Sequence, residues 1–98
     1  MIELNGNELR VRGSMLIADA PALLAAGRGF LAGLPGAGGE VVLDLSAVNE
    51  ADSAALGVVF ALQRSASARG QALRLANPPA GLLSLAGLYG VTDALPLA

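Results

Sequence analysis

The chain of 98 residues carries a net charge of −2 and contains neither cysteine nor histidine. Its length suits one small domain with one modest core, and we expect a single domain over residues 1–98. The missing residue types remove the usual ligands of zinc, haem and iron–sulfur sites and the usual thiol and Ser-His-Asp nucleophiles. The low net charge gives no reason to expect capture of nucleic acid. We therefore expect no metal, no cofactor and no nucleic-acid partner.

Apolar residues make up 54% of the chain, which is high for so small a domain. No charged residue occurs between Leu75 and Thr92, but residues 77–79 (Asn-Pro-Pro) and three glycines interrupt that stretch. The pieces that remain are too short to cross a bilayer as one helix, so we expect a cytoplasmic protein that meets a membrane only through a partner. Two explanations of the apolar surplus stay open: a surface covered by a partner, or a composition that is simply rich in alanine.

The first third of the chain has the pattern of a hairpin followed by a helix. Residues 2–12 alternate around an Asn-Gly turn, and Gly13 is expected to end the second strand. A helix is expected to begin at Asp19, as an acidic cap with Pro21 in the first turn, and to end at Leu34.

The rest of the chain alternates strands and helices. Residues 40–45 are apolar on both faces, as in a buried strand, and residues 72–76 are expected to form a further strand. Helices are expected over residues 53–69 and 80–89, with one last turn within residues 92–96. This order predicts an α/β fold with a mixed, mostly parallel sheet of about four strands, an N-terminal antiparallel hairpin and three to four helices.

The best candidate for a functional site is the polar turn between the strand of residues 40–45 and the helix that begins at Ser53. Ser53 places a hydroxyl at a helix N-terminus beside the carboxylates of Glu50 and Asp52. Helix capping alone explains Asp52 and Ser53. A helix N-terminus also favours an added phosphate, which the two carboxylates oppose, so phosphorylation there could displace a docked partner. Both interpretations stay open.

The motif Asp44-Leu45-Ser46, followed by Asp52-Ser53 and Leu56 at the start of a helix, resembles the STAS domain family of anti-sigma factor antagonists and several transporters. The hairpin and the order of elements agree over essentially the whole chain. Ala55 stands where the family usually has glycine, and Ala54 where many phosphorylated antagonists carry another hydroxyl. The tail over residues 85–96 looks like the MlaB-type STAS subunit of phospholipid-transport ABC systems.

The resemblance implies a STAS-type fold and a non-enzymatic accessory subunit that binds and stabilises the ATPase subunit of an ABC transporter. Ser53 would then lie where the domain meets the ATPase. One alternative is an anti-sigma factor antagonist that a partner anti-sigma factor kinase switches by phosphorylating Ser53. A second is a nucleotide- or lipid-binding STAS module, and a homodimer of the isolated chain also stays open. The residues expected to support Ser53 are Asp44, Ser46, Asn49, Glu50, Asp52, Ala54, Ala55, Leu56 and Gly57.

Overall fold

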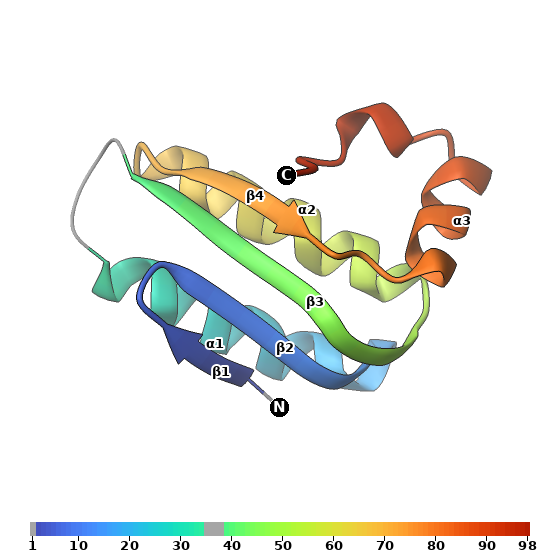
Figure 1. Cartoon of the computed structure of the whole chain (residues 1–98), viewed down its shortest axis with the longest axis horizontal. Helices are drawn as coiled ribbons and strands as arrows, with labels where there is room; N and C mark the ends of the chain where they lie inside the picture. The colour runs from blue at the N-terminus through green and yellow to red at the C-terminus, as the bar shows by residue number, and fades with distance from the viewer. Residues whose placement is uncertain (1, 35–38) are drawn as a thin grey trace.

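A computed structural model describes residues 2–34 and 39–98, and its centre is a four-stranded sheet in the order β1-β2-β3-β4 (Figure 1). The pairing of β1 with β2 is antiparallel, whereas β2 with β3 and β3 with β4 are parallel. The predicted α/β class, with its N-terminal antiparallel hairpin, is confirmed. The strands are β1 (Ile2–Asn5), β2 (Glu8–Met15), β3 (Glu40–Ala51) and β4 (Ala72–Ala76).

Two helices cover one face of the sheet, and a third lies at the end of the sheet where β3 and β4 finish (Figure 1). They are α1 (Ala20–Gly33), α2 (Ser53–Ala68) and α3 (Ala80–Leu88), with the short 3-10 helices η1 (Ile17–Asp19) and η2 (Thr92–Ala94). The three α-helices were all expected, and their ends differ from the predicted ends by about one residue, which is within ordinary fraying. No helix in the described part of the chain has the length and apolarity needed to cross a bilayer.

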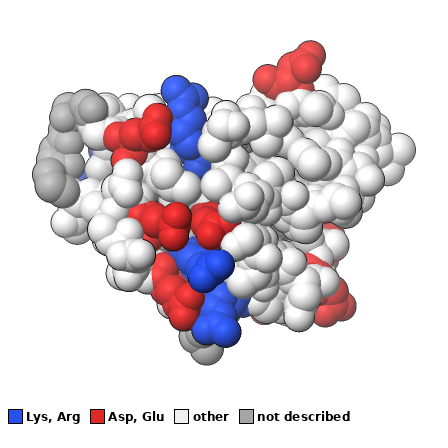
Figure 2. All heavy atoms as spheres, viewed as in Figure 1, with Lys and Arg blue, Asp and Glu red and all other residues white. Residues whose placement is uncertain are grey.

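The core lies between the sheet and helices α1 and α2. Alternate residues of each strand point to that side, and they meet one apolar stripe from each helix. The opposite face of the sheet is not covered by α1 or α2 and carries charged side chains, several of them paired across strands (Figure 2). The largest fully buried side chains of the core are Met15, Leu31, Leu43, Leu45, Leu62, Leu75, Leu82, Val41 and Val59.

Two strands are longer than expected. Gly13 was expected to end β2, but it adopts a φ of +87° and the strand continues to Met15 after a register shift between Gly13 and Ser14. Glycine reaches this conformation at little cost, so the strand bulges there and does not stop. The extension gives β3 a partner, and β3 therefore continues past Leu45 to Ala51. The predicted polar turn is mostly strand.

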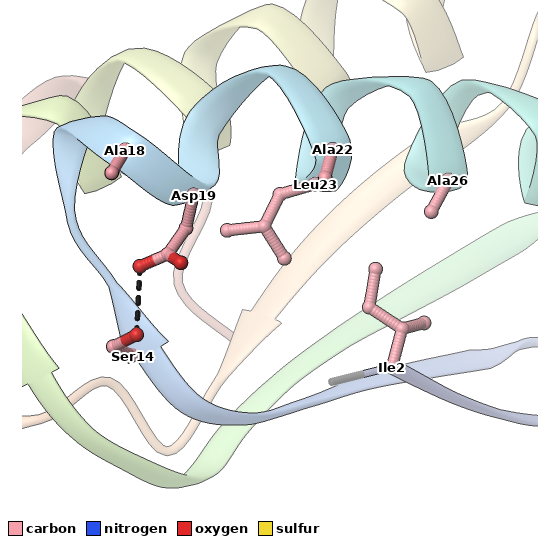
Figure 3. Close-up of a pocket in the computed structure, with 7 residues that line it drawn as sticks. All are labelled: Ile2, Ser14, Ala18, Asp19, Ala22, Leu23 and Ala26. Carbon is pink, nitrogen blue, oxygen red and sulfur yellow. Dashed lines mark hydrogen bonds between the residues drawn. The ribbon is translucent and has the colours of Figure 1, made fainter.

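The expected side-chain cap of α1 is also wrong. Asp19 precedes the helix, but its carboxylate makes no hydrogen bond to the first helical amides. It accepts hydrogen bonds from the backbone amide of Leu16 and the hydroxyl of Ser14, at 2.9 and 2.7 Å. The short 3-10 helix η1 intervenes between β2 and α1. The Asp19 carboxylate, which Figure 3 shows bonded to Ser14, therefore stabilises the start of η1 and not the start of α1.

One buried carboxylate joins three parts of the sheet's open face. Asp44 on β3 accepts hydrogen bonds from Ser46 and from the side chain of Asn77, just after β4, and it forms an ion pair with Arg10 of β2. Burial raises the pKa of Asp44, but the hydrogen bonds from Asn77 and Ser46 and the charge of Arg10 outweigh it and lower the pKa below the ordinary 3.8. The ionised form is therefore the one that the fold stabilises.

Replacement Asp44→Asn should lower the free energy of unfolding at neutral pH by about 1–3 kcal/mol, because an amide group then faces donors that need an acceptor. A lowered folded-state pKa gives stability that is complete above 3.8 and disappears as pH falls through the folded-state value. The difference in the free energy of unfolding between wild type and variant should therefore disappear in acid, as measured by urea unfolding across pH. The exposed Asp93→Asn is the control, and a gap that stays constant with pH would contradict this assignment.

Helices α1 and α2 approach closely at a glycine. A Cβ atom on Gly27 would lie 2.6 Å from a terminal carbon of Leu62, which is itself only 2% exposed. Gly29, two residues further along α1, is exposed and has no atom within 4 Å of such a Cβ. Substitutions at Gly27 and Gly29 therefore distinguish the effect of helix propensity on stability from the effect of packing.

Gly29→Ala should stabilise the protein by up to about 1 kcal/mol, since alanine favours a helix more than glycine does. Gly27→Ala gains the same propensity but overpacks against Leu62, so we expect a net loss of about 1 kcal/mol. Thermal and urea unfolding of both variants measure the difference. Equal stabilisation by both would show that the two helices can separate at no cost.

Candidate functional site

Ser53 is the first residue of α2 and is exposed. The residue that caps the helix is Asp52, whose Oδ1 accepts a hydrogen bond from the backbone amide of Ala54 at 2.9 Å. No hydrogen bond joins the Ser53 hydroxyl to any other side chain or backbone group among residues 2–34 and 39–98. Capping therefore accounts for Asp52 but leaves the Ser53 hydroxyl available to a group outside the domain.

The second oxygen of Asp52 holds a neighbouring segment in place. Asp52 Oδ2 accepts a hydrogen bond from the backbone amide of Ile17 at 3.0 Å, and the Asp52 amide donates to the carbonyl of Met15 at 3.4 Å. One side chain thus joins the end of β3, the start of α2 and the start of η1. The Ile17 side chain, 75% exposed, is held beside the start of α2.

Ile17 is the site residue that sequence reasoning missed. It follows the buried Met15 and the half-buried Leu16, and nothing in the alternation of apolar residues marks it as the exposed member of the group. A large aliphatic side chain in solvent costs hydration free energy that a partner's surface would recover.

The residues expected to support Ser53 divide into two separate groups. Asn49, Glu50 and Gly57 are exposed near the start of α2, and Gly57 lies one turn beyond Ser53 on the same side of the helix. Ala54 is half-buried, whereas Ala55 and Leu56 are buried and belong to the core. Ala55 and Leu56 therefore pack the first turn of the helix against the core.

Asp44 and Ser46 do not lie at this site. They are part of β3, and the strand rise puts Asp44 roughly 20 Å or more from the start of α2. Ser46 instead accepts a hydrogen bond from Arg10 on the open face of the sheet and donates to Asp44. At the start of α2 the structure therefore joins Asp52 to Ile17 and Ala54, with Ser53 and Gly57 exposed on the helix itself, whereas Asn49 and Glu50 are exposed residues of the preceding strand β3.

The chemistry available at this site is that of an exposed alcohol on a helix N-terminus. The free amides and the macrodipole favour negative charge there, whereas the Glu50 and Asp52 carboxylates oppose it. Within the described ranges, no group of three or more acidic side chains is arranged to hold a metal ion. The site can thus offer close contact to another protein, or accept a phosphate that would change that contact.

Comparison with solved structures shows the same fold in several proteins. A putative anti-sigma factor antagonist from Thermotoga maritima is 17% identical, with 99% of this chain and 83% of that chain covered and a TM-score of 0.69. An anti-sigma factor antagonist from Mycobacterium paratuberculosis is 25% identical, with 99% and 81% covered and a TM-score of 0.69. A sulfate transporter family protein from Wolinella succinogenes is 20% identical, with 90% and 69% covered and a TM-score of 0.67.

No curated protein matches the chain. A family model described as "Mlab, STAS domain" matches residues 1–97. The match extends from the hairpin to the last turn, and the four-stranded sheet with its parallel crossovers agrees with it. The chain therefore belongs to the Mlab-type STAS domain family.

Proposed function

We propose that this chain is a non-enzymatic, cytoplasmic subunit that binds and stabilises the ATPase of an MlaB-type phospholipid-transport ABC system. The observation that carries the proposal is the match of residues 1–97 to the Mlab-type family, because it selects one branch of the STAS domains. Contact occurs at the start of α2, where Ser53 is exposed and makes no hydrogen bond to another described residue. The domain meets the membrane only through the transporter.

The geometry at Ser53 supports a protein contact. The Asp52 side chain satisfies the first amide of α2 and anchors η1, so Ser53 and Ile17 are presented on a rigid frame. Gly57, one turn further on, has no atom near the position of a Cβ and leaves room for another backbone to approach. The exposed Ile17 side chain offers apolar area that a partner's surface would remove from water.

Replacement Ser53→Glu should weaken binding to the ATPase subunit at least tenfold, because a charged and longer side chain would be buried in the contact. The same replacement should not harm folding, since a carboxylate in the first turn of a helix is favourable. Isothermal titration of the purified ATPase subunit with each variant measures the effect.

Ser67→Glu is the matched control, because Ser67 is an exposed serine near the other end of α2. It should bind as wild type does. Equal affinity of Ser53→Glu and Ser67→Glu would show that the start of α2 is not the contact.

A second candidate function is that of an anti-sigma factor antagonist switched by a kinase. The specific observation in its favour is the fold shared with two anti-sigma factor antagonists over 99% of this chain, one of them 25% identical. The exposed hydroxyl at a helix N-terminus is chemically suited to accept a phosphate. Phosphate there would add charge beside the exposed Glu50 and displace a docked partner.

If this second function holds, the cognate anti-sigma kinase with ATP should phosphorylate Ser53 and leave Ser67 unmodified, as mapped by tandem mass spectrometry. Ser53→Ala should abolish the modification without unfolding the domain, because the helix cap belongs to Asp52. An unmodified Ser53 after exhaustive incubation would eliminate this alternative.

A further inference from the structure

The side of α2 that faces away from the sheet carries a row of four regularly spaced residues. Helix α2 belongs to the layer that covers one face of the sheet, and its inner side packs into the core (Figure 1). Successive members of the row are separated by four, three and four positions, so they follow one stripe over about 16 Å of the helix axis. Three of them are exposed, and the aromatic one is half-buried. The members of this α2 stripe are Ser53, Gly57, Phe60 and Arg64.

The spacing of the α2 stripe is the same in both directions along the helix. A two-fold axis through the middle of the stripe therefore brings an antiparallel copy of α2 onto it with the residues in register. Gly57 then faces Phe60 of the second copy, and Ser53 faces Arg64 of the second copy. Gly57 has no atom within 4 Å of the position of a Cβ. The glycine thus leaves room for the ring that the two-fold axis places opposite it.

The two ends of the α2 stripe carry opposite charges. Helix α2 contains no acidic residue and one basic residue, Arg64, whereas Glu50 and Asp52 come just before its first residue. Arg64 and Glu50 are exposed, and neither forms a hydrogen bond or an ion pair with another described residue. Glu50 precedes Ser53 by three residues, so their Cα atoms lie within about 11 Å of each other. In an antiparallel pair, Arg64 of each copy therefore meets the acidic end of the other.

From this complementarity of charge and shape we propose that a second copy of this chain covers the α2 stripe, in a two-fold symmetric dimer with antiparallel α2 helices. The contact is essentially one pair of helices, which is smaller than the roughly 800 Å² per partner of a standard interface, so the dimer is weak. Its charged pairs lie at the rim, so added salt weakens it. Ser53 lies inside the contact, and the dimer therefore excludes an ATPase from Ser53; this consequence alone rests on the proposed function.

The test is sedimentation equilibrium of the isolated full chain, at concentrations up to about 1 mM, where weak contacts are populated. Wild type should dimerise. Arg64→Glu and Glu50→Arg should each weaken the dimer about tenfold or more, because each variant places like charges opposite each other at both ends of the contact. An equimolar mixture of the two variants should dimerise about as tightly as wild type, because both ends of the mixed pair again join opposite charges. No ATPase is present, so the result does not depend on the proposed function.

Two control variants separate this contact from general effects of charge and of helix composition. Arg74→Glu makes the same change of charge on the exposed surface of β4 and should dimerise as wild type does. Gly57→Leu fills the room for Phe60 of the second copy and should weaken the dimer about tenfold, whereas Gly29→Leu, at an exposed glycine of α1, should not. A wild-type chain that stays monomeric at about 1 mM, or a mixture of the charge variants that does so, would overturn the proposal. Equal effects of Arg64→Glu and Arg74→Glu, or of the two leucine variants, would also overturn it.

Discussion

The structure around the candidate site depends on the two hydrogen bonds that the Asp52 side chain accepts. One oxygen satisfies the amide of Ala54 at the start of α2, and the other holds the amide of Ile17 at the start of η1. Segments separated by 35 residues in sequence are thereby fixed side by side. Because Asp52 fills the role of cap, Ser53 is released from that role and its hydroxyl can serve recognition or modification.

The many apolar residues of the sequence lie in two kinds of place, the core and the surface. Much of it fills the core between the sheet and helices α1 and α2. Several large apolar side chains stay in solvent, among them Ile17 beside Ser53, Leu4 of β1, and Leu88 and Tyr89 at the end of α3. Single exposed apolar residues are normal, but Ile17 lies next to an available hydroxyl on a fixed frame, which is why it enters the proposed contact.

Local signals made most of the fold predictable. The Asn-Gly turn, the proline in the first turn of α1 and the glycine after α2 each act within a few residues, so the hairpin and the helices were placed within about one residue. The continuation of β2 through Gly13 and of β3 to Ala51 was not predictable, because each extension exists only through pairing with the other. Pairing across more than 30 residues leaves no local pattern.

The candidate site was predictable only in part, because local signals identify the helix start but not the contacts between segments distant in sequence. The signature of a helix start identifies Asp52 and Ser53 together. It does not show that the Asp52 side chain accepts the hydrogen bonds from the amides of Ala54 and Ile17 while the Ser53 hydroxyl accepts neither. The Asp44 and Ser46 side chains were grouped with Ser53 on sequence proximity, and the unexpected length of β3 carries them away along the sheet. Asp19 was expected as a helix cap and instead fixes the chain before η1.

Crosslinking tests directly whether the first turn of α2 faces a protein partner. The chain has no cysteine, so Ser53→Cys and Ser67→Cys each introduce one unique thiol for a short photo-crosslinker. In the transporter assembled with its ATPase, position 53 should crosslink strongly to the ATPase and position 67 only weakly. Crosslinking from position 67 alone would contradict it.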